Sequence, residues 1–127
     1  MRLAFVDLLF SWPPDGGADT DLFHTVRELE LLGHEVHVFV ASRADSWQRG
    51  NVAPERVPFP LTRLDFGRHD FTRRKLPARF RRAVDDWRPD AVFLCDGFFL
   101  KPYVAEALSD YPLALRYYAY ELSCPGD

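Results

Sequence analysis

The sequence predicts a three-layer α/β domain with a Rossmann-like parallel sheet in the strand order 3-2-1-4-5. Short apolar runs typical of buried strands alternate along the chain with segments whose apolar residues recur at helical spacing. Such alternation favours parallel strands joined by right-handed crossovers. The chain has 127 residues, 47% of them hydrophobic, which suffices for one core. We therefore expect a single domain over residues 1–127.

The first βαβ unit lies between Arg2 and Val40. Leu3–Val6 is an apolar run and reads as the first strand. Leu22 and Val26 then recur at helical spacing, and Gly33 occupies the position of a helix C-terminal cap. Glu35–Val40 reads as the second strand. The turn before this helix therefore lies at the carboxyl end of the first strand, where open α/β sheets bind their ligands.

Prolines divide the middle of the chain. They confine a short third strand, expected at Arg56–Phe59, to a sheet edge. Pro77 suits the first residue of the next helix, where its missing N–H costs nothing. Phe80, Val84 and Trp87 follow at spacings of four and three residues, so they are expected to face the sheet.

The last third repeats the strand–helix–strand pattern. Asp90–Cys95 reads as the fourth strand, and Pro102 lies in the first turn of a helix whose apolar side carries Val104 and Leu108. Leu113–Tyr118 reads as the fifth strand. The predicted strand order places the ends of strands one and four side by side, at the switch point of the sheet.

Gly16 and Gly17 form the best candidate for a binding turn. Paired glycines permit positive φ and allow a ligand to approach the backbone closely. The following helix offers unpaired N–H groups to a phosphate. In the alternative interpretation this is an ordinary tight turn, with Asp19 or Thr20 as the helix cap. Neither G-x-G-x-x-G nor a P-loop is present, which argues against a dehydrogenase or a P-loop nucleotide hydrolase.

The chain resembles the amino-terminal domain of GT-B-fold glycosyltransferases of family 4. That family opens with a strand, the motif Pro-Pro-x-x-Gly-Gly-Ala-Glu, a helix and Gly-His-Glu-Val-x-Val. The matching stretches here are Pro13-Pro14-Asp15-Gly16-Gly17-Ala18-Asp19 and Gly33-His34-Glu35-Val36-His37-Val38. Two further stretches are similar to later family motifs, namely Arg88-Pro89-Asp90-Ala91-Val92 and Tyr120-Glu121-Leu122-Ser123-Cys124-Pro125.

The resemblance implies a retaining transfer of sugar from a nucleotide-diphosphate sugar to a sugar or lipid-linked acceptor. In the family the amino-terminal domain holds the acceptor, and its glycine turn, here Gly16 and Gly17, approaches the donor diphosphate. The donor-binding Glu-x7-Glu motif of the carboxyl-terminal domain is absent from these 127 residues. We therefore expect the chain to be the amino-terminal half of a two-domain enzyme and to be inactive by itself.

Other site residues follow from position at predicted strand ends. Carboxylates there could bind sugar hydroxyls or accept a proton. The catalytic candidates are Asp96, Tyr118 and Glu121, and the acceptor cleft is expected to include Asp15, Asp96, Tyr118 and Tyr120. Two positions depart from the family: its histidine after strand four falls on Cys95, and its later His-Asp pair falls on Tyr118 and Ala119.

The composition indicates neither a cofactor nor a metal site. The four histidines have no ligand spacing, and Cys95 is expected to be a buried packing residue rather than a nucleophile. No apolar run approaches the roughly 20 residues that span a bilayer, and no signal peptide is evident. We expect a cytoplasmic protein with reduced thiols.

Positive charge is concentrated in residues 68–88, which hold eight of the sixteen basic residues and three acidic ones. The cluster comprises Arg73, Arg74, Lys75, Arg79, Arg81 and Arg82. These residues form either a solvated helix face or a surface that meets anionic lipid at the inner membrane face. Nucleic acid is not an expected partner, because the remaining surface is acidic.

Two alternatives to a transferase were considered. A non-catalytic Rossmann-like module that binds sugar or protein would share the fold and the glycine turn. A receiver domain would need clustered acids after strand one and a lysine after strand five, but Asp7 is followed by Leu8 and Lys101 falls in a helix. The receiver interpretation therefore fails.

Overall fold

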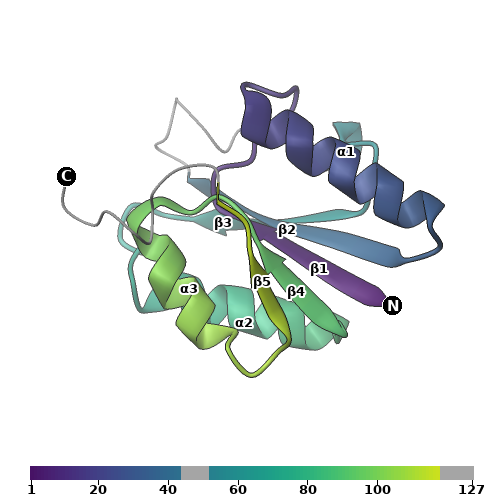
Figure 1. The fold of residues 1–127 in the computed structure, drawn as a ribbon. Helices are drawn as coiled ribbons and strands as arrows, with labels where there is room; N and C mark the ends of the chain where they lie inside the picture. Colours follow the sequence, from purple (N-terminus) through teal and green to yellow (C-terminus); the bar gives the residue numbers. More distant parts are fainter. Residues whose placement is uncertain (44–51, 118–127) are drawn as a thin grey trace.

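Strands and helices alternate along the computed structural model, which describes residues 1–43 and 52–117 (Figure 1). The strands are β1 (Arg2–Asp7), β2 (Glu35–Arg43), β3 (Leu61–Phe66), β4 (Ala91–Leu94) and β5 (Leu113–Leu115). The helices are α1 (Gly17–Leu31), α2 (Lys75–Trp87) and α3 (Lys101–Ala107), with short 3₁₀ turns η1 (Pro54–Arg56) and η2 (Phe98–Leu100).

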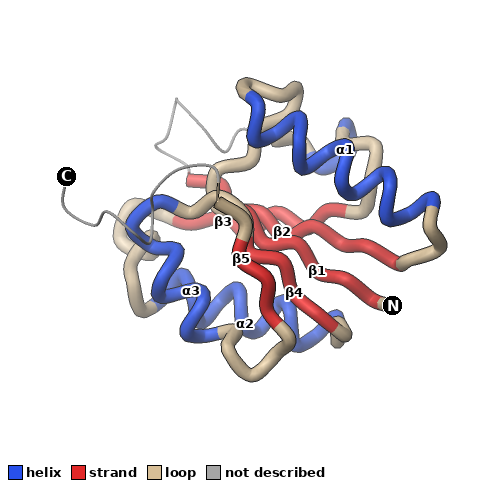
Figure 2. Tube along the Cα trace, viewed as in Figure 1, coloured by secondary structure: helices blue, strands red, loops and turns tan. Residues whose placement is uncertain are grey.

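The five strands form one parallel sheet in the order β3-β2-β1-β4-β5, which confirms the predicted order. Helix α1 covers one face of the sheet, and α2 and α3 cover the other (Figures 1 and 2). In the register of the sheet, Phe5 of β1 lies opposite Val38 of β2 and Phe93 of β4. The rings of Phe5 and Phe93 stack, with their centroids 4.8 Å apart. The chain therefore folds as the predicted three-layer α/β domain.

The side chains of β1 alternate between two cores because successive strand residues point to opposite faces. Phe5 packs under α1, and Val6 packs under α2 and α3. The α1 core includes Leu3, Phe5, Phe10, Leu22, Val26, Val36, Val38, Val40, Val52, Phe59 and Cys95. The core under α2 and α3 includes Ala4, Val6, Phe39, Phe66, Phe80, Val84, Val92, Leu94, Val104 and Leu108. Because both faces are covered, the central strands read as almost continuous apolar runs.

The third strand is the main error in the predicted elements. It was expected at Arg56–Phe59, but β3 spans Leu61–Phe66 and η1 ends at Arg56. Pro58 and Pro60 lack the N–H groups that a ladder requires, and pairing begins where the Pro60 carbonyl accepts the Val38 N–H at 3.0 Å. The strand does lie at a sheet edge, as predicted.

Helix ends follow local chemistry. Gly33 has φ of +93°, the left-handed conformation of a C-terminal cap, as predicted. Arg88, which caps the end of α2, also takes a positive φ of 58°, the left-handed conformation common at helix ends. Helix α2 begins at Lys75 rather than Pro77, since the Thr72 hydroxyl accepts the Lys75 N–H at 3.1 Å. Pro102 lies in the first turn of α3, as predicted.

Candidate functional site

The candidate site is the edge of the sheet where β1, β4 and β5 end. Crossovers leave β1 toward β2 and β4 toward β5 in opposite directions, so the gap between β1 and β4 is the switch point of the sheet. The loop after β1 leads to Gly16 and Gly17 at the start of α1, and Asp96 follows β4. The backbones of the two loops are joined here, because the Leu8 N–H donates to the Asp96 carbonyl at 2.9 Å.

The glycine turn is extended rather than left-handed. Gly16, the N-cap of α1, has φ and ψ of −178°, and Gly33 is the glycine with positive φ in the described residues. Neither Gly16 nor Gly17 uses the positive φ that glycine permits. A Cβ added to either glycine meets no atom within 4 Å. The domain itself would accept a side chain there, and the space beside the turn is open.

The expected helix cap is also different. Gly16 makes no side-chain cap, and neither Asp19 nor Thr20 is the N-cap residue. Asp19 is buried and instead accepts the N–H groups of Ser11 (3.3 Å) and Asp15 (2.9 Å) through its two carboxylate oxygens. The Asp19 carboxylate thus holds the loop that precedes the helix. Asp15, an expected cleft residue, lies exposed on this loop.

An aromatic cluster packs against the same loop. Phe10 and Trp12 of the loop pack against Phe23 of α1 and Phe59, which precedes β3. The closest pair is Trp12 and Phe23, whose ring centroids are 5.2 Å apart. Phe10 is fully buried. The loop is therefore held both by this aromatic packing and by its hydrogen bonds to Asp19 before it reaches the glycines.

Asp7 is a site residue that the sequence analysis missed. It ends β1 and is only 1% exposed. One carboxyl oxygen accepts the Leu9 N–H at 2.8 Å, and the other is buried without a hydrogen-bond partner among the described residues. Burial raises the pKa of Asp7 to about 8, and the nearby carboxylates of Asp96 and Asp19 act in the same direction. Asp7 is therefore largely uncharged at pH 7.

Cys95 and Asp96 follow β4 directly. Cys95 is fully buried in the α1 core, and burial raises the pKa of its thiol well above the usual value. A buried, protonated thiol is a packing residue rather than a nucleophile, in line with the sequence. Asp96 is buried, with 9% of its surface exposed at the candidate edge.

Lys101 and Arg116 also line this edge and were not predicted. Lys101 is fully buried at the start of α3; its Nζ donates to the Arg116 carbonyl and lies 5.0 Å from the Tyr117 ring centroid. The Arg116 guanidinium donates to the Asp21 carboxylate, which ties the end of β5 to α1. Gly97 permits this packing, since a Cβ there would lie 3.0 Å from the Lys101 Cβ.

Tyr118, Tyr120 and Glu121 lie outside the described residues. Of the predicted site residues, Asp15, Gly16 and Gly17 follow β1 and lead into α1, and Asp96 follows the neighbouring strand β4.

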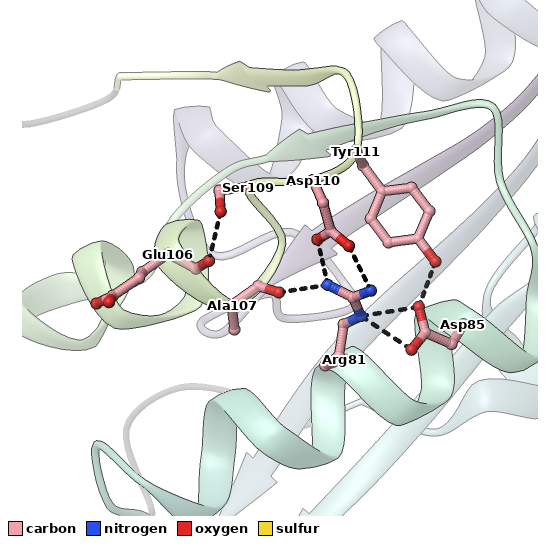
Figure 3. Close-up of polar contacts among 7 residues, drawn as sticks. All are labelled: Arg81, Asp85, Glu106, Ala107, Ser109, Asp110 and Tyr111. Carbon is pink, nitrogen blue, oxygen red and sulfur yellow. Dashed lines mark hydrogen bonds and ion pairs between the residues drawn. The ribbon is translucent and has the colours of Figure 1, made fainter.

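Arg81 of the basic cluster is held by hydrogen bonds and ion pairs within the domain. Arg81 donates to the carboxylates of Asp85 and Asp110 and to the Ala107 carbonyl, and Asp85 also accepts the Tyr111 hydroxyl (Figure 3). This network joins α2 to the end of α3. The Tyr111 hydrogen bond and the Arg81 guanidinium together lower the pKa of Asp85.

The other five residues of the basic cluster make fewer contacts than Arg81 or are exposed. Lys75 pairs with Asp70 at 3.1 Å, and the Arg79 guanidinium lies 4.3 Å from the Phe66 ring centroid. The exposed members Arg73, Arg74 and Arg82 remain on the surface. No helix in the described ranges is long and apolar enough to cross a bilayer.

A pocket of about 300 Å³ lies at the other end of the sheet, between α2 and the first residues of β2 and β3. Its lining residues are His37, Phe39, Thr62, Ala83, Asp86 and Trp87. His37 bonds Thr62 at 2.7 Å, and burial lowers the His37 pKa, with the Arg2 charge acting in the same direction. This pocket is separate from the switch-point edge.

Comparison with known protein families matches residues 16–116 to the family model described as a glycosyl transferase 4-like domain. No curated protein matches the chain, and no solved structure matches it.

Proposed function

Because this chain belongs to the glycosyl transferase 4-like domain family, we propose that it is the acceptor-side domain of a retaining glycosyltransferase. The enzyme would transfer a sugar from a nucleotide-diphosphate sugar to the hydroxyl of an acceptor. The observation that carries the proposal is the family match across residues 16–116. The glycine turn and Asp96 lie within this match and follow the neighbouring strands β1 and β4. A second, donor-binding domain would face this edge.

The donor diphosphate would meet the first turn of α1. A helix start offers unpaired N–H groups and a partial positive charge, and Gly16 brings no side chain that would occupy them. The open space beside Gly16 and Gly17 supports close approach of a phosphate. The helix dipole contributes roughly 0.3–2 kcal/mol to anion binding, whereas millimolar affinity needs about 4 kcal/mol. The turn therefore serves as one wall of a donor site that the second domain completes.

The acceptor would lie over the ends of β4 and β5. Asp96 is the described carboxylate best placed to bind an acceptor hydroxyl, with Asp15 on the opposite side of the switch point. Tyr118, Tyr120 and Glu121 remain proposed members of this cleft. Cys95 cannot take the role of the family's histidine, because its side chain is buried in the core.

This buried Cys95 is the observation that favours the alternative function, a non-catalytic module that binds sugar or protein. A transferase without a histidine at that position needs another group to handle the acceptor proton. The two functions differ in turnover: a transferase releases nucleoside diphosphate, and a binding module does not.

We expect purified residues 1–127 to release no UDP or GDP from UDP-glucose, UDP-galactose or GDP-mannose, because half of the donor site is missing. Turnover by this chain alone would overturn the two-domain proposal. The complementary assay uses a protein that joins this domain to a donor-binding domain. Failure of that protein to release nucleoside diphosphate, combined with retained sugar binding, would favour the binding module.

Replacing Gly17 tests the turn directly. In the two-domain protein, Gly17→Val should lower kcat/KM by about tenfold or more, since a side chain would enter the donor's path. The melting temperature should not fall, because a Cβ at this position meets no atom within 4 Å. Gly67→Ala is the matched control, since its Cβ would make an ordinary 3.4 Å contact with Asp70 after β3. Equal activity of both variants would exclude the turn from the donor site.

Membrane contact by the basic cluster is tested by vesicle sedimentation. Lys75 and Arg81 are ion-paired within the domain. We therefore expect equal binding to neutral vesicles of phosphatidylcholine and to anionic vesicles that also contain phosphatidylglycerol. A preference for anionic vesicles that the double variant Arg73→Gln/Arg74→Gln removes would establish the contact instead. The control pair Arg27→Gln/Arg56→Gln changes the charge equally at exposed positions outside the cluster.

A further inference from the structure

Asp7 is a buried acid for which the proposed transfer chemistry has no use. Its carboxyl lies at the end of β1, directly before the loop that carries the glycine turn. One oxygen accepts the Leu9 N–H, and the other has no hydrogen-bond partner among the described residues. A buried carboxylate with a bare oxygen would be costly, whereas a protonated carboxyl is tolerated more easily.

The loop after β1 is held by carboxyl groups at both ends. Asp7 accepts the N–H of Leu9 at the start of the loop. Asp19 accepts the N–H groups of Ser11 and Asp15 further along it. The glycine turn begins with the residue after Asp15, so its position depends on these three hydrogen bonds.

The charged groups around Asp7 disfavour its ionisation. The Asp96 carboxyl on the loop after β4 and the Asp19 carboxyl on α1 raise the pKa of Asp7, whereas the backbone N–H groups of Leu9 and Asp96 favour the ionised form and lower it. Cys95 of the same loop carries a protonated thiol, which contributes no compensating charge. On the β2 side Asp7 pairs with Val40, which has no charge. The charges of Arg116 after β5 and Lys101 of α3 lower the pKa of the Cys95 thiol, and that of Asp21 on α1 raises it.

We infer that Asp7 is a positioning residue for the loop after β1, and that ionisation of its buried carboxyl, which sets a negative charge against the carboxyl groups of Asp19 and Asp96, displaces the loop and the Gly16–Gly17 turn. The use of that turn for a donor rests on the proposed function, but the coupling between Asp7 and the turn does not. A glycine turn controlled in this way would change position with pH, and the change would be centred where Asp7 titrates, at about pH 8.

The test is a pH titration of amide chemical shifts in the ¹⁵N-labelled 127-residue chain, from pH 5 to 10. In the wild-type chain the amides of Leu9, Ser11, Asp15 and Gly17 should all shift with one midpoint at about pH 8. In Asp7→Asn this step should vanish while the spectrum stays dispersed. Asp90→Asn is the matched control: it removes an exposed strand-flanking acid that accepts the Arg2 N–H at 2.7 Å, and it should keep the step.

The outcomes are distinct. A step confined to Leu9 would make Asp7 a local cap and overturn the positioning role. A step at Asp15 and Gly17 that persists in Asp7→Asn would assign it to another group. If the variant does not fold, the titration of the Asp7 side-chain carboxyl carbon in the wild-type chain still decides, since a midpoint below pH 5 would overturn the inference. The titration contains no nucleotide sugar, so a negative result would overturn the role of Asp7 and would not bear on the proposed sugar transfer, which the release of nucleoside diphosphate tests separately.

Discussion

Phe80→Ala should lower the free energy of unfolding by about 3–5 kcal/mol, the usual cost of removing a large buried aromatic side chain. Phe80 of α2 is fully buried, and its ring stacks on Phe66 with a centroid separation of 6.1 Å. It lies in the core that joins α2 and α3 to the sheet, beside Leu94 and Val104. The packed neighbours can collapse only in part, so the substitution leaves a cavity.

Urea unfolding followed by circular dichroism measures this loss. Phe99→Ala is the matched control, because the same chemical change at a residue that is 75% exposed should cost at most about 0.5 kcal/mol. Since a domain of this size has a total stability of about 5–15 kcal/mol, Phe80→Leu serves as a milder second variant, expected to cost about 1 kcal/mol. Equal losses for Phe80→Ala and Phe99→Ala would contradict the described packing of α2 on the sheet.

Strong local patterns account for the parts of the fold that the sequence predicted. Leu3–Val6 and the run from Ala91 to Cys95 lie in strands covered on both faces and therefore appear as uninterrupted apolar runs. Gly33 needs a conformation that few other residues adopt, so it marks a helix end by itself. The alternation of strands and helices predicted the parallel sheet, and the expected strand order 3-2-1-4-5 is the one observed.

The bounds of strand β3 were predicted wrongly, because the strand lies at the sheet edge and its polar residues remain in solvent. Leu64 and Phe66 face the core, while the intervening Asp65 and the preceding Arg63 are exposed. This alternation with a period of two was the available signal. The strand was expected at Arg56–Phe59 instead, but Pro58 and Pro60 lack the N–H groups that strand pairing requires.

The candidate site was predicted only in part, because burial of its acids depends on segments distant in sequence. Gly16, Gly17 and Asp96 stand at strand ends that the pattern reveals. Asp7 looks like an ordinary strand-end acid until α1 and the loop after β4 close over it. Lys101 at a helix start likewise reads as solvated, yet it is buried once β5 lies beside α3.

Asp7→Asn should remove a pH dependence of stability that the wild-type domain shows between about pH 4 and 8. The folded state holds the Asp7 proton up to about pH 8, whereas the unfolded chain releases it near the ordinary value of 3.8. Between these values the unfolded state binds fewer protons, so wild-type stability is complete below pH 4 and falls as the pH rises to 8. A shift of this size corresponds to a loss on the order of 5 kcal/mol.

The Asn side chain keeps the oxygen that accepts the Leu9 N–H, has nearly the same shape and carries no charge at any of these pH values. At pH 4 and below the variant should therefore match the wild-type domain; at pH 5 it should be more stable by about 1–2 kcal/mol, and at pH 9 by several kcal/mol. Urea unfolding at pH 5, 7 and 9 measures the difference. Asp70, Asp85 and Asp110 do not interfere, because ion pairs and hydrogen bonds lower the pKa of each and confine their effects to more acidic solutions. Asp90→Asn should show the wild-type slope, and a wild-type domain whose stability does not fall between pH 5 and 8 would show that Asp7 is ionised in the folded state.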